Sequence, residues 1–139
     1  MRGKTIGEMK VGESAYVEKT ISESDVYLFA GITGDFNPAH VNKVEAEKSR
    51  FGRRIAHGML CAGLISAVLG TRLPGPGTIY LGQELKFTKP VFIGDTIRAT
   101  VTVSELREEK NIVKLQTVCT NQDGEIVLEG VATMMPPKA

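Results

Sequence analysis

Apolar and polar residues alternate along much of the second half of the chain, a pattern that predicts β-strands. The alternation is regular from residue 97 to residue 103, with apolar residues at the odd positions. A period of two places apolar side chains on one face of a strand. Short turns such as Asp123-Gly124 separate the strands, and short connections require antiparallel pairing. The predicted strands are residues 79–87, 97–103, 113–117 and 126–135.

The first half of the chain combines a strand with helices. Residues 11–21 suit a strand, and Ser22 is a suitable N-cap for a helix that follows it. The glycines at 31 and 34 are expected to fray that helix before Pro38. We therefore expect an ordered non-helical loop over residues 35–40, and a short polar helix over residues 43–49.

Residues 58–70 read GMLCAGLISAVLG, in which Ser66 is the only polar side chain. A helix that is apolar on every side is expected to be buried on every side. A long antiparallel sheet that curls around one such helix gives an α+β architecture known as the hot-dog fold. An open sandwich is the weaker alternative, because it leaves the apolar helix unexplained. We expect a single domain that spans residues 1–139.

Composition narrows the class of protein. The chain has 139 residues, 42% of them hydrophobic, and 17 basic residues balance 16 acidic ones. Nucleic-acid binding requires a clustered basic excess, so we expect no nucleic-acid partner. The apolar stretch 59–69 is too short to span a bilayer, and the N-terminus has no secretory signal pattern. We expect a cytoplasmic protein with no membrane partner, in which Cys61 and Cys119 are buried thiols.

Asp35 and His40 are the first candidate for chemistry, within the stretch GDFNPAH. A carboxylate and an imidazole in a loop held by proline can converge on one water molecule. Histidine suits proton transfer near neutral pH, and a carboxylate can orient it. The same residues also favour a turn, in which Asp35 accepts backbone N–H groups. Spacing alone therefore leaves both a turn and an active site open.

His57 and Gly58 mark the start of the apolar helix and form the second candidate. Backbone N–H groups at a helix start are unpaired and carry partial positive charge, which suits an oxyanion or a polarised carbonyl. Gly58 would allow a substrate oxygen to come close to the backbone. For His57 we expect a packed or capping imidazole. Ser66 either bonds to its own helix or faces a pocket.

Four basic residues follow the short polar helix, and such groups are usually solvated surface. They are Lys48, Arg50, Arg53 and Arg54. If the substrate carries phosphates, they are the first place to look for an electrostatic dock. The scattered His and Cys residues argue against a zinc site, and we expect no metal and no organic cofactor.

The stretch from Phe29 to His40 closely resembles the hydratase-2 motif of the MaoC-like (R)-specific enoyl-CoA hydratases. The resemblance continues in three further stretches. They are Ile55–Leu60, Leu73–Phe87 and Pro90–Asp95. It implies a hot-dog fold, usually a homodimer, and syn addition of water to a trans-2-enoyl-CoA to give an (R)-3-hydroxyacyl-CoA. The motif of the acyl-carrier-protein dehydratases, a His followed by Pro-Gly-His-Phe-Pro, is absent.

Position by position, the resemblance implies roles for four residues. Asp35 and His40 match the catalytic pair, Gly58 matches the backbone donor to the thioester oxygen, and Ser66 matches a supporting serine. Ala39 and Asn42 depart from the family's usual residues, which leaves the acyl-length preference open. Two alternatives remain for the function: a hot-dog subunit that binds acyl-CoA without turnover, and a hot-dog acyl-CoA thioesterase.

Overall fold

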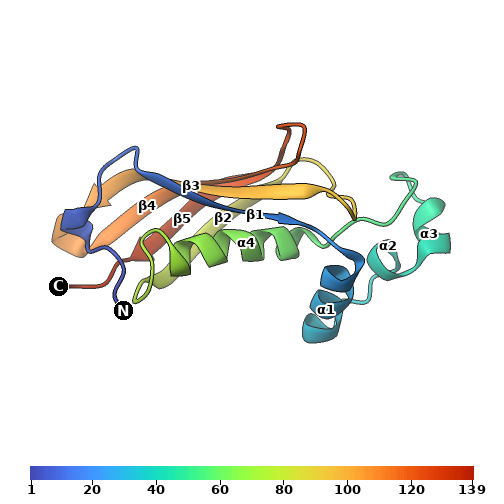
Figure 1. Cartoon of the computed structure of the whole chain (residues 1–139), viewed down its shortest axis with the longest axis horizontal. Coiled ribbons are helices and arrows are strands. Elements are labelled where there is room, and N and C mark those ends of the chain that lie inside the picture. The colour runs from blue at the N-terminus through green and yellow to red at the C-terminus, as the bar shows by residue number, and fades with distance from the viewer.

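The protein is described here by a computed structural model of all residues 1–139, which consists of one five-stranded antiparallel sheet and a set of helices (Figure 1). The strands are β1 (Ser14–Thr20), β2 (Ile79–Phe87), β3 (Thr96–Arg107), β4 (Ile112–Thr120) and β5 (Ile126–Met135). The helices are α1 (Glu23–Thr33), α2 (Pro38–Val41), α3 (Lys43–Glu47) and α4 (Gly58–Thr71), with short 3-10 turns η1 (Ile6–Glu8) and η2 (Glu108–Lys110). The predicted α+β class is confirmed.

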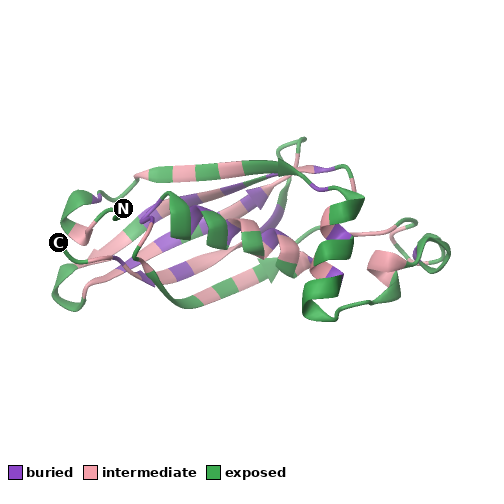
Figure 2. Ribbon diagram, turned by 60° about the horizontal axis from the view of Figure 1, so that its bottom comes forward, coloured by how far each residue is buried: buried purple, intermediate pink, exposed green.

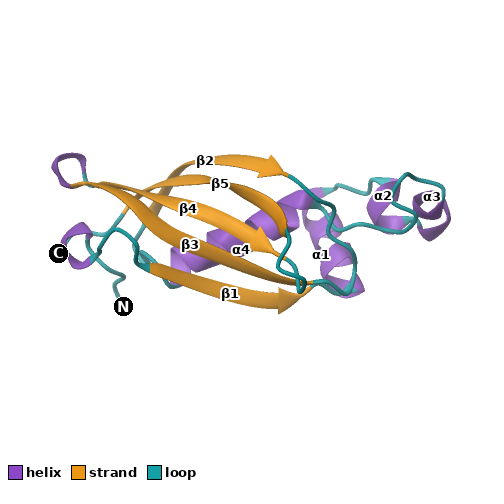
Figure 3. Ribbon diagram, turned by 90° about the horizontal axis from the view of Figure 1, so that it is seen from above, coloured by secondary structure: helices purple, strands orange, loops and turns teal.

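The sheet has the strand order β1-β3-β4-β5-β2, so β1 and β2 are its edges (Figure 3). All four pairs of neighbours are antiparallel, as the short connections require. The alternation predicted for β3 is confirmed, because Ile97, Ala99, Val101 and Val103 are all buried. These side chains form one wall of the hydrophobic core.

Helix α4 lies along one face of this sheet and buries only one side of itself. Cys61, Ile65, Val68 and Leu69 pack into the core. The opposite side of the helix is exposed (Figure 2). It includes Met59, whose exposed fraction is 56%. The prediction that α4 is buried on every side is therefore wrong for a single chain. The reason is that the sheet covers one face of the helix and does not close around the other.

Two local predictions in the first half also need correction. Helix α1 continues through Gly31 and ends at Gly34, whose φ of 81° makes it a left-handed C-cap. Residues 38–41 form the helical turn α2, whereas residues 38–40 were predicted to lie in a non-helical loop. Pro38 is compatible with this turn because the first residue of a helix needs no N–H partner, and Asn37 caps it by accepting the Ala39 N–H. Only residues 35–37 remain as loop.

Helices α1, α2 and α3 project beyond the end of the sheet, on the side where α4 begins (Figure 1). The two chain termini lie together at the opposite end of the molecule. None of the helices combines the length and the hydropathy that a membrane span requires. Cys61 and Cys119 are free and buried, as predicted.

Candidate active site

Asp35 and His40 come together at the start of α4. Possible ligand atoms of Asp35, His40 and His57 all lie within 4.8 Å of one another. Asp35 is exposed in the single chain and His40 is half-buried. The turn and the active-site interpretations of Asp35 are compatible, because its Oδ1 accepts the Asn37 N–H at 3.2 Å while the side chain remains beside His40.

A hydrogen bond fixes which nitrogen of His40 is available. Nδ1 lies 2.7 Å from the carbonyl oxygen of Ile55. A carbonyl oxygen only accepts hydrogen bonds, so Nδ1 carries the hydrogen and donates it. In the neutral ring Nε2 is then the acceptor. His40 can therefore take a proton from a water molecule through Nε2.

Gly58 begins α4, and none of the hydrogen bonds within the chain uses its backbone N–H. His57 occupies the N-cap position, but its side chain makes no capping hydrogen bond. The positive end of the helix dipole is therefore open at Gly58. A Cβ atom at this position would lie 2.6 Å from Cε1 of Phe87, so only glycine fits without moving that ring.

Ser66 lies farther along α4, on its exposed face. Eight residues separate it from Gly58, a rise of about 12 Å along the helix. Its hydroxyl group makes no hydrogen bond in the single chain, so of the two alternatives for Ser66 the bond to its own helix is not present. The structure brings Asp35 and His40 together, but it does not bring Ser66 next to them.

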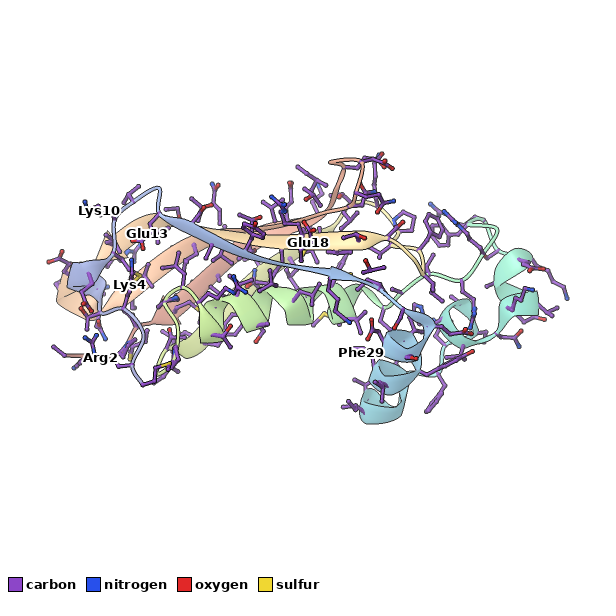
Figure 4. The ribbon with its side chains drawn as sticks, in the orientation of Figure 1. Arg2, Lys4, Lys10, Glu13, Glu18 and Phe29 are labelled. Carbon is purple, nitrogen blue, oxygen red and sulfur yellow. The ribbon has the colours of Figure 1, made fainter.

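His57 is a part of this site whose contacts the sequence did not predict. Its side chain is 2% exposed, and Nε2 lies 3.0 Å from the carbonyl oxygen of Asp35. Its ring lies between Phe29, at 4.8 Å, and His40, at 3.9 Å between centroids. Phe29 comes from α1 (Figure 4). The packed imidazole expected for His57 is present, and it packs on the proposed catalytic residues.

The same three residues offer ligand types that divalent metals accept. Tetrahedral zinc with histidine ligands requires ligand atoms about 3.3 Å apart, given metal–nitrogen distances near 2.0 Å. The ligand atoms here are up to 4.8 Å apart, and the two imidazole rings stack instead of converging. The arrangement suits proton transfer better than it suits metal binding.

A cavity of about 460 Å³ lies beside the first turn of α4. Its walls are mainly apolar and include Gly58, Met59, Phe87 and Val91. Asp35 and His40 are not among its lining residues. Gly58 therefore connects the cavity with the Asp35–His40 pair. It lines the cavity, and it directly follows His57, which contacts both Asp35 and His40.

The four basic residues have different environments. Arg54 bonds to Glu23 and to the Tyr27 hydroxyl, each at 2.7 Å, and its hydrogen bond lowers the pKa of Glu23. Arg53 stacks on Phe92 at 3.7 Å, and Lys48 lies 3.5 Å from Glu45. Arg50 makes no ion pair, and it lines the cavity together with Lys89. Arg50 is the one residue of this group that has no acidic partner and also lines the cavity.

Comparison with known proteins agrees with this geometry. The sequence profile of the family described as MaoC like domain matches residues 8–124. The chain is 61% identical to an (R)-specific enoyl-CoA hydratase of Rhodospirillum rubrum, over 94% of this chain and 90% of that protein. It is 50% identical to a 3-hydroxybutyryl-CoA dehydratase of Methylorubrum extorquens, over 94% of this chain and 83% of the relative.

The fold is also that of solved structures. An unliganded R-hydratase PhaJ1 from Pseudomonas aeruginosa superposes with a TM-score of 0.94 and 44% identity, covering 99% of this chain and 88% of the other. An antiparallel sheet packed on one long helix, with an Asp–His pair beside the start of that helix, defines a hot-dog protein of the hydratase class. The chain belongs to the MaoC-like family.

Proposed function

We propose that this protein is an (R)-specific enoyl-CoA hydratase, which adds water reversibly to a trans-2-enoyl-CoA to form an (R)-3-hydroxyacyl-CoA. The observation that carries this proposal is the juxtaposition of Asp35 and His40 beside the open N-terminus of α4. The 61% identity to a hydratase of this specificity supports it. In the reverse direction the enzyme is a 3-hydroxyacyl-CoA dehydratase, a hydro-lyase.

Water addition requires two proton transfers on one face of the double bond. The water molecule is held between the Asp35 carboxylate and Nε2 of His40, the free acceptor of that ring. As the water loses a proton to this pair, its oxygen forms a bond to C3 of the enoyl group. The pair then returns a proton to C2 from the same side, which gives syn addition. General acid–base groups of this kind contribute about 10²–10⁴-fold to rate.

The thioester oxygen gains negative charge while C3 is attacked. The unpaired N–H of Gly58 and the dipole of α4 are placed to stabilise that charge. The absence of a side chain at Gly58 lets the oxygen come close to the backbone. In this proposal Gly58 binds the thioester, while Asp35 and His40 handle the water.

The nucleotide part of coenzyme A carries phosphate groups, which require cations. Arg50 has no acidic partner and borders the cavity that Gly58 lines. We assign Arg50 as the phosphate contact within the basic group, because Arg54 is paired with Glu23 and Arg53 does not line this cavity. Charge-assisted hydrogen bonds to phosphate suit arginine well.

The proposal includes a homodimer. The exposed side of α4 and the edge strand β2 together present exposed apolar side chains, among them Met59, Ile79 and Leu81. Ser66 lies on this same side of α4. A second copy placed on this surface would complete the burial expected for α4. It would also enclose the candidate active site, in which Asp35 is exposed when one chain is considered by itself.

A cytoplasmic location is part of the same proposal. The two cysteines are buried and unpaired, which fits a reducing compartment.

A single assay separates the hydratase from both alternatives. Crotonyl-CoA is mixed with the enzyme while the enoyl absorbance and free thiol are followed together. A hydratase lowers the enoyl absorbance without releasing thiol, and chiral analysis of the product gives the (R)-alcohol. A thioesterase releases thiol, and a binding subunit changes neither signal. Either of the last two results would contradict the proposed function.

A further inference from the structure

We propose that His57 is a positioning residue of the active site, which holds the main chain of Asp35 and supports the ring of His40. The inference rests on the proposed hydratase function and adds to it a residue that positions the Asp35–His40 pair. It starts from the buried environment of His57, which is 2% exposed and therefore has no access to substrate.

The first contact is a hydrogen bond that joins two distant parts of the chain. Nε2 of His57 lies 3.0 Å from the carbonyl oxygen of Asp35, 22 residues earlier. Since the carbonyl can only accept, Nε2 donates. The other hydrogen bonds of residues 34–37 are local, for example Asp35 N–H to Thr33 Oγ1 at 3.2 Å. The bond from His57 therefore attaches this loop to the start of α4.

The second contact is with His40 itself. The two imidazole rings have centroids 3.9 Å apart and planes 30° apart, and Phe29 packs on His57 at 4.8 Å. His40 is also held by Ile55, two residues before His57, through the 2.7 Å bond at Nδ1. One short segment, residues 55–57, thus positions both members of the pair. Catalytic geometry of this kind is sensitive, and a shift of about 1 Å costs about 10²-fold in rate.

A cost in stability accompanies this arrangement. With the hydrogen on Nε2, Nδ1 of His57 is an acceptor, and it is buried without any hydrogen-bond partner. Burying an unpaired polar atom is unfavourable, and an apolar side chain would avoid it. His57 also makes no capping bond to α4. A purely structural role therefore does not account for a histidine at this position, whereas holding Asp35 does.

Two amide substitutions test the donor directly. His57→Gln can place an N–H near the position of Nε2, while His57→Asn reaches only as far as Nδ1. Both variants replace the buried imidazole by an amide side chain. We expect His57→Asn to lower kcat by about 10²-fold with little change in KM, and His57→Gln to restore kcat to within about tenfold of wild type. Equal losses in the two variants, or wild-type kcat in His57→Asn, would overturn the proposal.

A double-mutant cycle separates positioning from general destabilisation. If His57 acts through Asp35, then adding His57→Asn to Asp35→Asn lowers the residual kcat far less than His57→Asn does alone. Full additivity would contradict the inference. Val113→Ala controls for a lowered Tm and is expected to keep wild-type kcat. Val113 is buried at the start of β4, and β4 begins at the end of the sheet away from α2 (Figure 1).

The wild-type enzyme is measured first, because its hydration of crotonyl-CoA tests the proposed function alone. If wild type is inactive, the proposed function fails. If wild type is active and the His57 variants match it, only the positioning role fails.

Discussion

The Asp35 carboxylate has one oxygen in a local hydrogen bond and one oxygen free. Oδ1 accepts the Asn37 N–H at 3.2 Å, which shapes the turn that precedes α2. No hydrogen bond within the chain occupies Oδ2, and the side chain remains exposed beside His40. The local bond limits the motion of the carboxylate, so a water molecule bound by it meets a defined geometry.

At Gly58 we predict that an added methyl group impairs catalysis. Gly58→Ala places Cβ 2.6 Å from the Phe87 ring, at the point where the thioester oxygen is expected to bind. We expect kcat/KM for crotonyl-CoA to fall by about tenfold or more, because small misplacements of a reacting group are costly. Steady-state kinetics checks this.

Gly31→Ala is the matched control for that change. Gly31 lies inside α1, and a Cβ there would have no heavy atom within 4 Å. Replacing a helical glycine by alanine stabilises by about 0.5–1 kcal/mol, so we expect a slightly higher Tm and unchanged kinetics. Wild-type kcat/KM in Gly58→Ala would contradict the role given to Gly58.

For Arg50 we predict an effect on CoA binding alone. Arg50→Ala is expected to raise KM for crotonyl-CoA by about three- to tenfold, the size of an exposed charge-assisted contact. Crotonyl-pantetheine lacks the nucleotide phosphates, so its kcat/KM is expected to stay unchanged. Arg98→Ala, which removes an exposed arginine paired with Glu18 at 2.9 Å, serves as the control. An equal loss with both thioesters would show that Arg50 does not contact phosphate.

At the residue scale the sequence predicted that Asp35 and His40 come together, and the structure brings them next to each other. It did not predict that Asn37 and Pro38 begin a helical turn, because the same residues also favour a loop. The contacts of His57 were not predicted, because its partners are 17 and 22 residues away in the chain. Which arginines of the basic group stay free of an acidic partner also depends on tertiary contacts, such as the pairing of Arg54 with Glu23.

At the scale of elements, α4 has two different sides. One side is buried against the sheet through Ile65, Val68 and Leu69. The other is exposed and has small residues such as Gly63 and Ala67, which allow another element to come close. The sequence pattern could not distinguish them, because both sides are apolar and periodicity carries no information when every position is hydrophobic.

Introducing a charge on the exposed side of α4 tests the proposed dimer. We expect Ala67→Glu to shift the protein from dimer to monomer in sedimentation velocity, and to lower the activity because the site is then left open to water. Gln116→Glu adds a negative charge at an exposed position of β4 and is expected to leave mass and activity unchanged. A wild-type mass and rate for Ala67→Glu would contradict the assignment of this face.

At the scale of the whole molecule, the predicted sheet and helix were correct, because long strands of alternating pattern and one long apolar helix carry strong signals. The extent of closure was predicted wrongly, because α4 was expected to be buried on every side and the sheet covers only one side of it. How far five strands curl around a helix depends on their twist and register, which no local pattern records.

The buried thiols provide a prediction for the entire fold. Burial raises the pKa values of Cys61 and Cys119 to about 12. We expect neither thiol to react with iodoacetamide at pH 8 in the native protein, and both to react after unfolding in guanidinium chloride. Mass spectrometry of the alkylated protein checks this, and rapid labelling of the native protein would contradict the burial of these residues.

The raised pKa values of the two thiols predict how the free energy of unfolding changes with pH. The folded thiols hold their protons up to about pH 12, whereas unfolded thiols release them near the ordinary pKa of 9.0. Above pH 9 the unfolded state therefore binds fewer protons, so the free energy of unfolding falls as pH rises toward 12. Urea unfolding at pH 8 and pH 10.5 is expected to show lower stability at the higher pH.

The central claim is that Asp35 and His40 together add water to an enoyl thioester, and the kinetics of Asp35→Asn and His40→Ala test it most directly. Each variant is first shown to be folded by circular dichroism, and its rate of crotonyl-CoA hydration is then compared with that of wild type. We predict that kcat falls by about 10²–10⁴-fold in each variant. A folded variant of either kind that hydrates crotonyl-CoA at the wild-type rate would contradict the account.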